Sequence, residues 1–186
     1  DSIAWLFNIR GTDIAYNPLV ISYAMVTEKK AFLFIPKAKV TKSLQKHLGD
    51  RIEILDYSKF SKQLKKRISK KMRIWLDPST TSWSIFRLLN GNCDLFWKQS
   101  PLVLMKAIKN KNEIKGMKSA HIRDGVAMVK FLYWLDRHLG KTKITEITAA
   151  EKLEEFRAEQ DLYQGPSFHP ISAYGAHAAI VHYSAT

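Results

Sequence analysis

The hydrophobic pattern of the chain changes near residue 100, and this change limits the folds that the chain can adopt. Before that point, short apolar runs alternate with stretches of helical periodicity. After it, apolar residues recur at spacings of three and four from Ile114 to Leu139, which is one stripe along a helix of about seven turns. We therefore expect a boundary between two differently built parts near residues 99–101.

The first hundred residues predict a mixed sheet covered by helices. Their short runs are rich in β-branched and aromatic residues and are bounded by turn signals, as strands are. Several runs lack an alternating pattern, so we expect helices over both faces of the sheet. Strands are expected at residues 3–7, 19–26, 31–35, 51–55 and 73–76, with an antiparallel hairpin through 26–31 and helices at 41–48, 57–71 and 82–89.

The remaining residues predict two helices followed by two short strands. Gly140 should end the long helix, and Thr145 can cap a second helix that runs to about residue 160. Beyond the break at Gly165-Pro166, residues 168–173 and 178–183 are short and rich in Ile, Val and Tyr, which favours strands. The long apolar stripe needs a partner surface, so we expect it to be covered by association.

Composition excludes several classes of protein. With 46% hydrophobic residues, the 186-residue chain is too apolar for a disordered protein. No run approaches the roughly 20 apolar residues of a membrane span. The single cysteine, Cys93, excludes an internal disulfide framework and a cysteine-based zinc site. Together with the lack of a visible signal peptide, these features predict a cytoplasmic setting and no membrane partner. The opening on Asp1 predicts that terminal residues have been lost.

The net charge of +13 is concentrated between residues 58 and 73, which hold eight basic residues and no acid. Such a surface can attract nucleic acid or an anionic membrane. In the same stretch, however, Phe60, Leu64, Ile68 and Met72 recur every four residues on one helix face. No aromatic residues interleave with the lysines to stack on bases. The pattern favours a helix that covers a sheet over a nucleic-acid interface.

Three of the six histidines lie in the expected helices. His47 and His138 suit surface or helix-end positions. His121 lies on the apolar stripe, where a buried, hydrogen-bonded histidine is more common than a metal ligand. Cys93, in a turn beside Asn92 and Asp94, has no neighbouring histidine in sequence and is interpreted as a structural thiol.

The other three histidines, His169, His177 and His182, fall within fourteen residues and could form a zinc cluster. A usable zinc site needs three or four converging ligands and supporting hydrogen bonds, and no acid follows Asp161 to complete one. In one continuous strand, His177 and His182 would also face opposite sides. A zinc site is the less favoured alternative, and spacing alone indicates an α/β module joined to part of a second domain, without a function.

Longer motifs resemble one family. Residues 8–18 are similar to the NxRGxDxxxNP segment of cytosolic Xaa-Pro aminopeptidases of the long, three-domain form. Residues 108–125 resemble the linker and first helix of the catalytic domain in that family, and residues 145–157 resemble its second helix. Residues 167–183 resemble the first strands of its pita-bread fold. The similarity runs in order through the whole chain.

The resemblance implies an α/β fold class, in which a mixed-sheet, creatinase-type middle domain is followed by the truncated start of a pita-bread α+β catalytic domain. Residues 1–98 would form the later part of the middle domain, and residues 99–186 the first part of the catalytic domain. The implied activity is that of a metallo-aminopeptidase that releases an N-terminal residue preceding proline. The alternative is a non-catalytic pita-bread relative that binds peptides, histones or nucleic acid.

The resemblance also implies cofactors and partners. Family members use two divalent metal ions, usually Mn²⁺, and a bridging hydroxide that attacks the scissile carbonyl. The family's metal ligands all come after the position of Thr186, so this chain is expected to supply no metal ligand. The implied partners are peptides with proline in second position and the remainder of a parent chain, and the apolar stripe adds the expectation of a second copy in a homodimer.

His182 is the catalytic residue that the resemblance implies. Within residues 180–183, it matches the family histidine that contacts the substrate and assists proton movement as the tetrahedral intermediate forms. Phe168 and Val181 match positions that line the substrate pocket, although apolar residues there are equally explained as core. Residues 169–170 and 176–177 depart from the commoner family residues.

Overall fold

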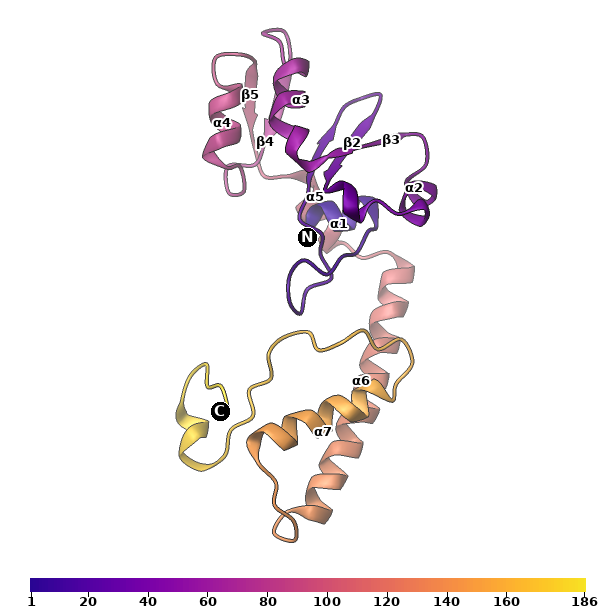
Figure 1. The fold of residues 1–186 in the computed structure, drawn as a ribbon, viewed down its shortest axis with the longest axis vertical. Coiled ribbons are helices and arrows are strands. Elements are labelled where there is room, and N and C mark those ends of the chain that lie inside the picture. Colours follow the sequence, from indigo (N-terminus) through magenta and orange to yellow (C-terminus); the bar gives the residue numbers. More distant parts are fainter. The chain divides into compact units, whose positions relative to one another are not determined.

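The structure is a computed structural model that describes all 186 residues (Figure 1). Its internal contacts divide it into two units. The first contains residues 1–14 and 18–108, and the second contains residues 15–17 and 109–186. The domain boundary expected between residues 98 and 99 concerns the organisation of a longer protein and stays a prediction.

Two small sheets form the framework of the first unit (Figure 1). In one sheet, β1 (Tyr23–Val26) pairs antiparallel with β2 (Ala31–Ile35), which pairs parallel with β3 (Ile52–Asp56). In the other, β4 (Arg73–Leu76) pairs parallel with β5 (Asp94–Trp97). The expected mixed sheet and its hairpin are confirmed. The sequence patterns do not predict β5, and the strands form two sheets instead of one.

Alternate side chains of β2 enter two separate cores, because successive side chains of a strand point to opposite faces. Leu33 and Ile35 pack in one cluster with residues of α1 and α2. Phe32 and Phe34 pack in the other with residues of α3 and α4. The expectation that helices cover both faces is therefore confirmed for this strand.

The helices of this unit are α1 (Ser2–Phe7), α2 (Lys42–Leu48), α3 (Phe60–Arg67), α4 (Trp83–Leu89) and α5 (Pro101–Ala107), with 3₁₀ turns at Lys37–Lys39 and Tyr57–Lys59.

Residues 3–7 form α1, so the strand predicted there is wrong. Ala4 and Phe7 lie three residues apart on one face of this helix, and both are buried. Asn8 ends the helix in the left-handed conformation, with φ of 48°. A run of five apolar residues does not by itself distinguish a buried helix from a strand.

The helix predicted over residues 57–71 is also shorter than expected. It ends at Arg67, because Ile68 adopts an extended backbone conformation with ψ of 146°. Phe60 and Leu64 are buried as the pattern requires, whereas Met72 is exposed. The sequence did contain a signal for α5, since Ser100 caps its first turn and proline occupies its first position.

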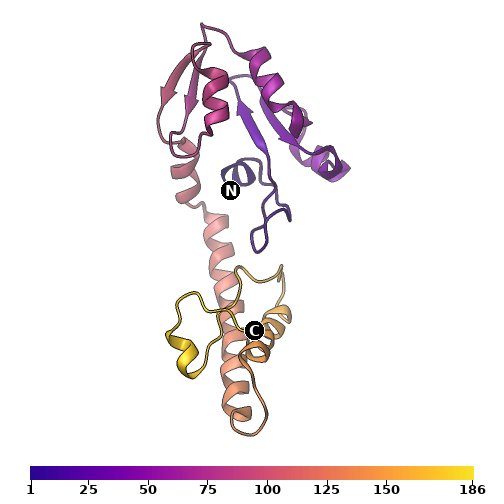
Figure 2. The same ribbon diagram turned by 60° about the vertical axis from the view of Figure 1, so that its left-hand side comes forward.

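The second unit is built on two helices, α6 (Lys111–His138) and α7 (Glu146–Ala158), which pack against each other (Figure 2). Asn110 and Glu113 form a capping box at the start of α6, and Thr145 caps α7 as predicted. The ion pairs Lys130–Glu159 and Arg157–Asp124, at 2.6 and 2.7 Å, join the two helices and the turn that follows α7.

The strands predicted at residues 168–173 and 178–183 are absent. The only regular element after α7 is a short 3₁₀ helix, η3 (Gly175–Ala179). A strand needs a neighbouring strand to pair with its backbone groups, and all five strands of the chain lie in the first unit. These apolar segments therefore run as an irregular chain.

The apolar stripe of α6 is largely exposed. Ala127 is the only buried residue of this helix, and Leu132 is 55% exposed. The prediction that His121 is buried is wrong: the residue is exposed, and its Nδ1 lies 2.8 Å from the carbonyl oxygen of Met117. None of the helices combines the length and the apolar character that crossing a membrane requires.

Candidate functional site

The motif of residues 8–18 forms a loop, of which residues 8–14 and 18 belong to the first unit. The amide of Gly11 donates to the carbonyl of Pro18, and the amide of Asp13 donates to that of Leu19. A Cβ atom on Gly11 would lie 2.9 Å from both the Leu19 carbonyl oxygen and the Val20 Cβ. Glycine is therefore required here by the close approach of two backbone segments.

The carboxylate of Asp13 fastens this loop. One oxygen accepts a hydrogen bond of 2.7 Å from the backbone amide of Ile21, and the other pairs with the Lys39 ammonium. The hydrogen bond from Lys39 is the largest cause of the lowered pKa of Asp13, followed by the bond from Ile21. Both carboxylate oxygens are thus engaged within the protein.

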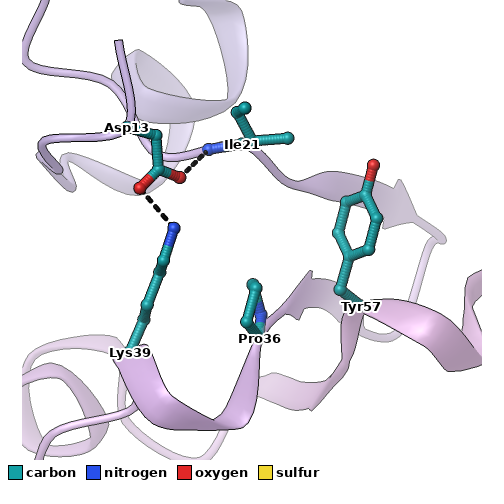
Figure 3. Close-up of a pocket in the computed structure, with 5 residues that line it drawn as sticks. All are labelled: Asp13, Ile21, Pro36, Lys39 and Tyr57. Carbon is teal, nitrogen blue, oxygen red and sulfur yellow. Dashed lines mark hydrogen bonds and ion pairs between the residues drawn. The ribbon is translucent and has the colours of Figure 1, made fainter. Parts of the chain in front are cut away.

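A pocket of about 390 Å³ lies beside this carboxylate and is lined by Asp13, Ile21, Pro36, Lys39 and Tyr57 (Figure 3). Figure 3 shows the Asp13–Lys39 pair on one side of the pocket and the Tyr57 ring on the other. Because the two charged groups neutralise each other, the pocket offers no unpaired charge to a ligand. We interpret this part of the motif as a structural fastening.

The residues predicted to act on substrate all lie in the irregular segment after α7. Phe168 is 66% exposed and Val181 is 82% exposed. His182 is also exposed, and none of the hydrogen bonds, ion pairs or ring contacts of the structure involves its side chain. Its backbone φ is 57°, in the left-handed region that residues with a side chain rarely adopt.

A hydrogen-bonded cluster lies directly beside His182 in the chain. Glu146, the first residue of α7, accepts hydrogen bonds from the Tyr174 amide at 2.6 Å and the Tyr183 hydroxyl at 2.6 Å. The Nδ1 atom of His177 lies 3.0 Å from the same carboxylate. The rings of His177 and Tyr183 stack, with centroids 4.7 Å apart. Three donors from the C-terminal segment therefore converge on one carboxylate.

The chemistry of these groups determines which of them can donate to the carboxylate. An ionised carboxylate only accepts hydrogen bonds, so His177 bonds to Glu146 in the form that carries a hydrogen on Nδ1, an atom that also lies 2.9 Å from the Tyr183 hydroxyl. The Tyr183 hydroxyl then donates to the other carboxylate oxygen. The bond from Tyr183 is the largest cause of the lowered pKa of Glu146, and the same bond raises the pKa of Tyr183.

The three C-terminal histidines do not converge on one point. Nδ1 of His169 lies 3.3 Å from the Tyr16 hydroxyl, and its Nε2 lies 3.3 Å from the Ser184 hydroxyl. His177 instead contacts Glu146. No three His, Cys, Asp or Glu side chains of the chain are grouped so that they could hold a metal ion. The residues present therefore do not fit a zinc site or a centre with two metal ions.

Sequence reasoning missed the link from Glu146 to Tyr183. The two residues are 37 positions apart, so no local pattern reveals the contact. One signal was available: no Asp or Glu follows Asp161, so any charged partner of the C-terminal histidines must come from an earlier element.

The remaining candidates have structural surroundings. His47 and His138 contact backbone carbonyls near helix ends, as expected. Cys93 is half-buried, burial raises the pKa of its thiol, and its Sγ contacts the Leu89 carbonyl oxygen at 3.5 Å. The lysines of α3 are exposed while its other side packs on the sheet, so the interpretation as a covering helix is confirmed.

Comparison with known proteins gives a family for each part of the chain. Residues 1–113 match the family described as Creatinase/Prolidase N-terminal domain, and residues 115–186 match Metallopeptidase family M24. An uncharacterized peptidase of Schizosaccharomyces pombe is 43% identical over 99% of this chain and 30% of its own length. The probable Xaa-Pro aminopeptidase P of Pyrenophora teres f. teres is 40% identical over 98% of this chain and 30% of its own length.

Solved structures agree with these matches. The X-prolyl aminopeptidase of Caenorhabditis elegans, described as a cytosolic enzyme with a di-nuclear active site, has a TM-score of 0.89 and 34% identity. The match covers 98% of this chain and 31% of that one. A Xaa-Pro dipeptidase of Bacillus anthracis, at 21% identity and a TM-score of 0.58, shares the fold over 85% of this chain and 42% of its own.

The chain thus spans about 30% of the length of the curated relatives named here. The family resemblance noted in the sequence is confirmed in both parts and in the same order. Because the first match covers more than half of its residues, the chain belongs to the creatinase/prolidase N-terminal domain family, and it continues into a segment that matches metallopeptidase family M24.

Proposed function

We propose that this chain is part of a metallo-aminopeptidase that releases an N-terminal residue preceding proline from peptides. The observation that carries the proposal is the similarity over 98% of the chain to the X-prolyl aminopeptidase of Caenorhabditis elegans, with a TM-score of 0.89. The alternative, a non-catalytic relative that binds peptides, histones or nucleic acid, is not favoured, because the relatives named above are peptidases.

In this proposal, His182 is the catalytic residue of the chain. An exposed imidazole without a partner in the protein is available to donate a hydrogen bond to a peptide carbonyl, or to hold a proton as charge develops there. Phe168 and Val181 would supply apolar surface to the substrate, because both side chains are exposed. A proline ring is an apolar group that such a surface can cover.

The proposal assigns two metal ions, Mn²⁺ by family resemblance, to ligands outside residues 1–186. The chain's own side chains form no group that fits a metal, so the metals are expected to be held by another part of a longer protein. By the same resemblance, residues 1–98 belong to a middle domain and residues 99–186 open the catalytic domain of a cytoplasmic enzyme.

Replacement of His182 in the full-length protein tests the proposal. We expect His182→Ala to lower kcat on Xaa-Pro peptides by about 10²- to 10⁴-fold, the usual contribution of acid–base catalysis. Metal content, measured by mass spectrometry, should remain that of the unmodified enzyme, because His182 is not a ligand. His47→Ala, which removes a histidine of α2, is the control and should keep kcat. Normal kcat in His182→Ala would remove this residue from the mechanism.

The 186-residue chain by itself should not hydrolyse Xaa-Pro peptides, even when Mn²⁺ is supplied. The physical reason is that no group of three potential ligands is present to hold a metal. Peptide hydrolysis assays with and without chelator check this expectation. Turnover that disappears with chelator would contradict the assignment of the ligands to another part of the protein.

The proposed partners of the chain are the remainder of a parent chain and a second copy in a homodimer. The exposed apolar residues of α6 support this expectation, because leaving apolar surface in water costs about 25 cal/mol per Å². Sedimentation at micromolar concentration checks whether the 186-residue chain associates. A monomer that binds no hydrophobic dye would contradict it.

A further inference from the structure

The C-terminal segment is held at two points by one carboxylate. Glu146 accepts a hydrogen bond from the backbone of Tyr174, just before η3, and another from the side chain of Tyr183, after η3. The Glu146 side chain is only 18% exposed. Residues 174–183 therefore form a loop whose two ends are tied to the start of α7.

His182 lies within this loop and immediately precedes its second fastening point. Its own side chain has no partner, and its left-handed backbone conformation is one that a residue with a side chain rarely adopts. Contacts of neighbouring residues must therefore maintain the conformation. The nearest in the chain are those of Tyr183, which bonds to Glu146 and stacks on His177.

We infer that Glu146 is a positioning residue for His182 and that it acts through Tyr183. This inference rests on the proposed function, because it concerns the orientation of the residue proposed to act on substrate. Glu146 does not touch His182 itself. Its carboxylate fixes the Tyr183 side chain, which fixes the peptide unit that joins residues 182 and 183 and so the direction of the His182 imidazole.

The carboxylate has no substitute in this part of the chain. No Asp or Glu follows Asp161, so another acid of the segment cannot take over the two bonds. The position of Glu146 at the first residue of a 13-residue helix also favours its negative charge, because the amino end of a helix carries partial positive charge. The carboxylate uses both of its oxygens as acceptors, whereas an amide would offer only one.

Substitutions in the full-length protein separate this role from general stability. Glu146→Gln removes the charge, and Tyr183→Phe removes only the hydroxyl while it keeps the ring that stacks on His177. The matched control is Tyr163→Phe, which deletes an equivalent hydrogen bond of 3.2 Å from a phenol to Glu154 of the same helix.

We expect each of the two test variants to lower kcat on an Xaa-Pro peptide by about 10- to 100-fold. KM should change less than about twofold, because a misplaced catalytic group slows chemistry more than binding. The double variant should be no slower than the slower single variant, because both remove one connection. Unchanged kcat in both, or an equal loss in Tyr163→Phe, would overturn the inference.

A spectroscopic measurement decides the inference independently of activity. In full-length protein labelled with ¹³C at histidine Cε1, the His182 signal is identified by its absence from His182→Gln. Glu146→Gln and Tyr183→Phe should shift or broaden this signal, whereas Tyr163→Phe should leave it unchanged. An unmoved signal in both test variants overturns the positioning role. If the unmodified enzyme fails to cleave Xaa-Pro peptides, the proposed function fails, and this signal still tests the link to His182.

Discussion

The two units of the molecule differ in what holds them together. All the buried hydrophobic residues except Ala127 lie in the first unit, where strands and helices cover one another. The second unit carries the predicted substrate-contacting residues but joins its parts by hydrogen bonds and ion pairs. A scaffold with its own core thus precedes a segment that carries the proposed substrate-contacting residues and depends on polar contacts for its order. Substitutions should therefore affect the two units very differently.

The largest difference is expected for truncation of an apolar side chain. Phe34 is completely buried between β2 and α3, so Phe34→Ala should lower the free energy of unfolding by about 3–5 kcal/mol. Leu132→Ala on the exposed stripe of α6 should lower it by less than about 1 kcal/mol, because this residue already contacts water. Urea-induced unfolding of each variant measures both values. Equal losses would mean that the second unit has a core of its own.

Two glycines should respond to the same substitution with opposite signs. Gly11→Ala should cost about 1–3 kcal/mol, because the new Cβ would meet backbone and side-chain atoms at 2.9 Å. Gly116→Ala, in α6, should stabilise by about 0.5–1 kcal/mol, because alanine favours helix and nothing lies within 4 Å of the new atom. Thermal unfolding gives both signs. A gain at Gly11 would show that the loop can move apart.

The pH dependence of stability should involve a carboxylate in each unit. Asp77 in the first unit accepts hydrogen bonds from the Ser100 amide and from the amide and hydroxyl of Ser79, and these lower its pKa. A carboxyl whose pKa is lower in the folded state stabilises the protein above its unfolded pKa, near 3.8 here. That stabilisation is lost as the pH falls through the folded value. The pKa of Glu146 in the second unit is also lowered, so its stabilising contribution is likewise lost as the pH falls.

We therefore expect Asp77→Asn to lower the Tm at pH 7 and to reduce the loss of Tm between pH 5 and acidic pH below about 3. Glu146→Gln should increase the local opening of residues 174–183 at pH 7 and should reduce the further increase in opening at acidic pH. Hydrogen exchange at both pH values measures these two changes. Both variants keep the Asp13 carboxylate, whose pKa is also lowered, so each should retain its contribution to the acid-induced loss of stability. An acid-induced loss of the same size in Asp77→Asn and the unmodified protein would contradict the first expectation.

The smallest effects are expected for exposed ion pairs. Arg73–Asp94 in the first unit and Arg157–Asp124 in the second are both 2.7 Å long. Each of Asp94→Asn and Asp124→Asn should cost less than about 1 kcal/mol. The cost should be larger for Asp124, because its pair joins the two helices of the unit that lacks a buried core. Urea titrations at low and high salt check the order, and a larger cost at Asp94 would reverse it.

Individual strands of the two sheets in the first unit could be predicted where the signal is local. The strands at residues 31–35 and 73–76 have the predicted bounds, because each is a short run rich in β-branched and aromatic residues. Residues 168–173 and 178–183 have the composition of strands but no strand beside them. Composition records a preference for extended backbone, and pairing requires a partner that the sequence of one segment does not describe.

The candidate site could likewise be predicted only in part. His182 could be proposed as a site residue because a continuous motif around it resembles a family. Its surroundings could not, because Glu146 reaches Tyr183 across 37 residues and the backbone between them turns through an irregular path. The local pattern identified Thr145 as the cap of α7 and assigned Glu146 no role in the site. Contacts between segments without periodicity depend on the path of the chain, which no hydrophobic pattern records.

The burial of β2 on both faces has a consequence for how its residues can change. Leu33 and Phe34 are neighbours in sequence, but they belong to different clusters, so their substitutions should act independently. Leu33 and Leu48 share a cluster, so a change in the size of one should alter the cost of a change in the other. The strand therefore separates two sets of residues that can compensate for one another. A substitution at one position of β2 should not restrict which substitutions are tolerated at the adjacent position.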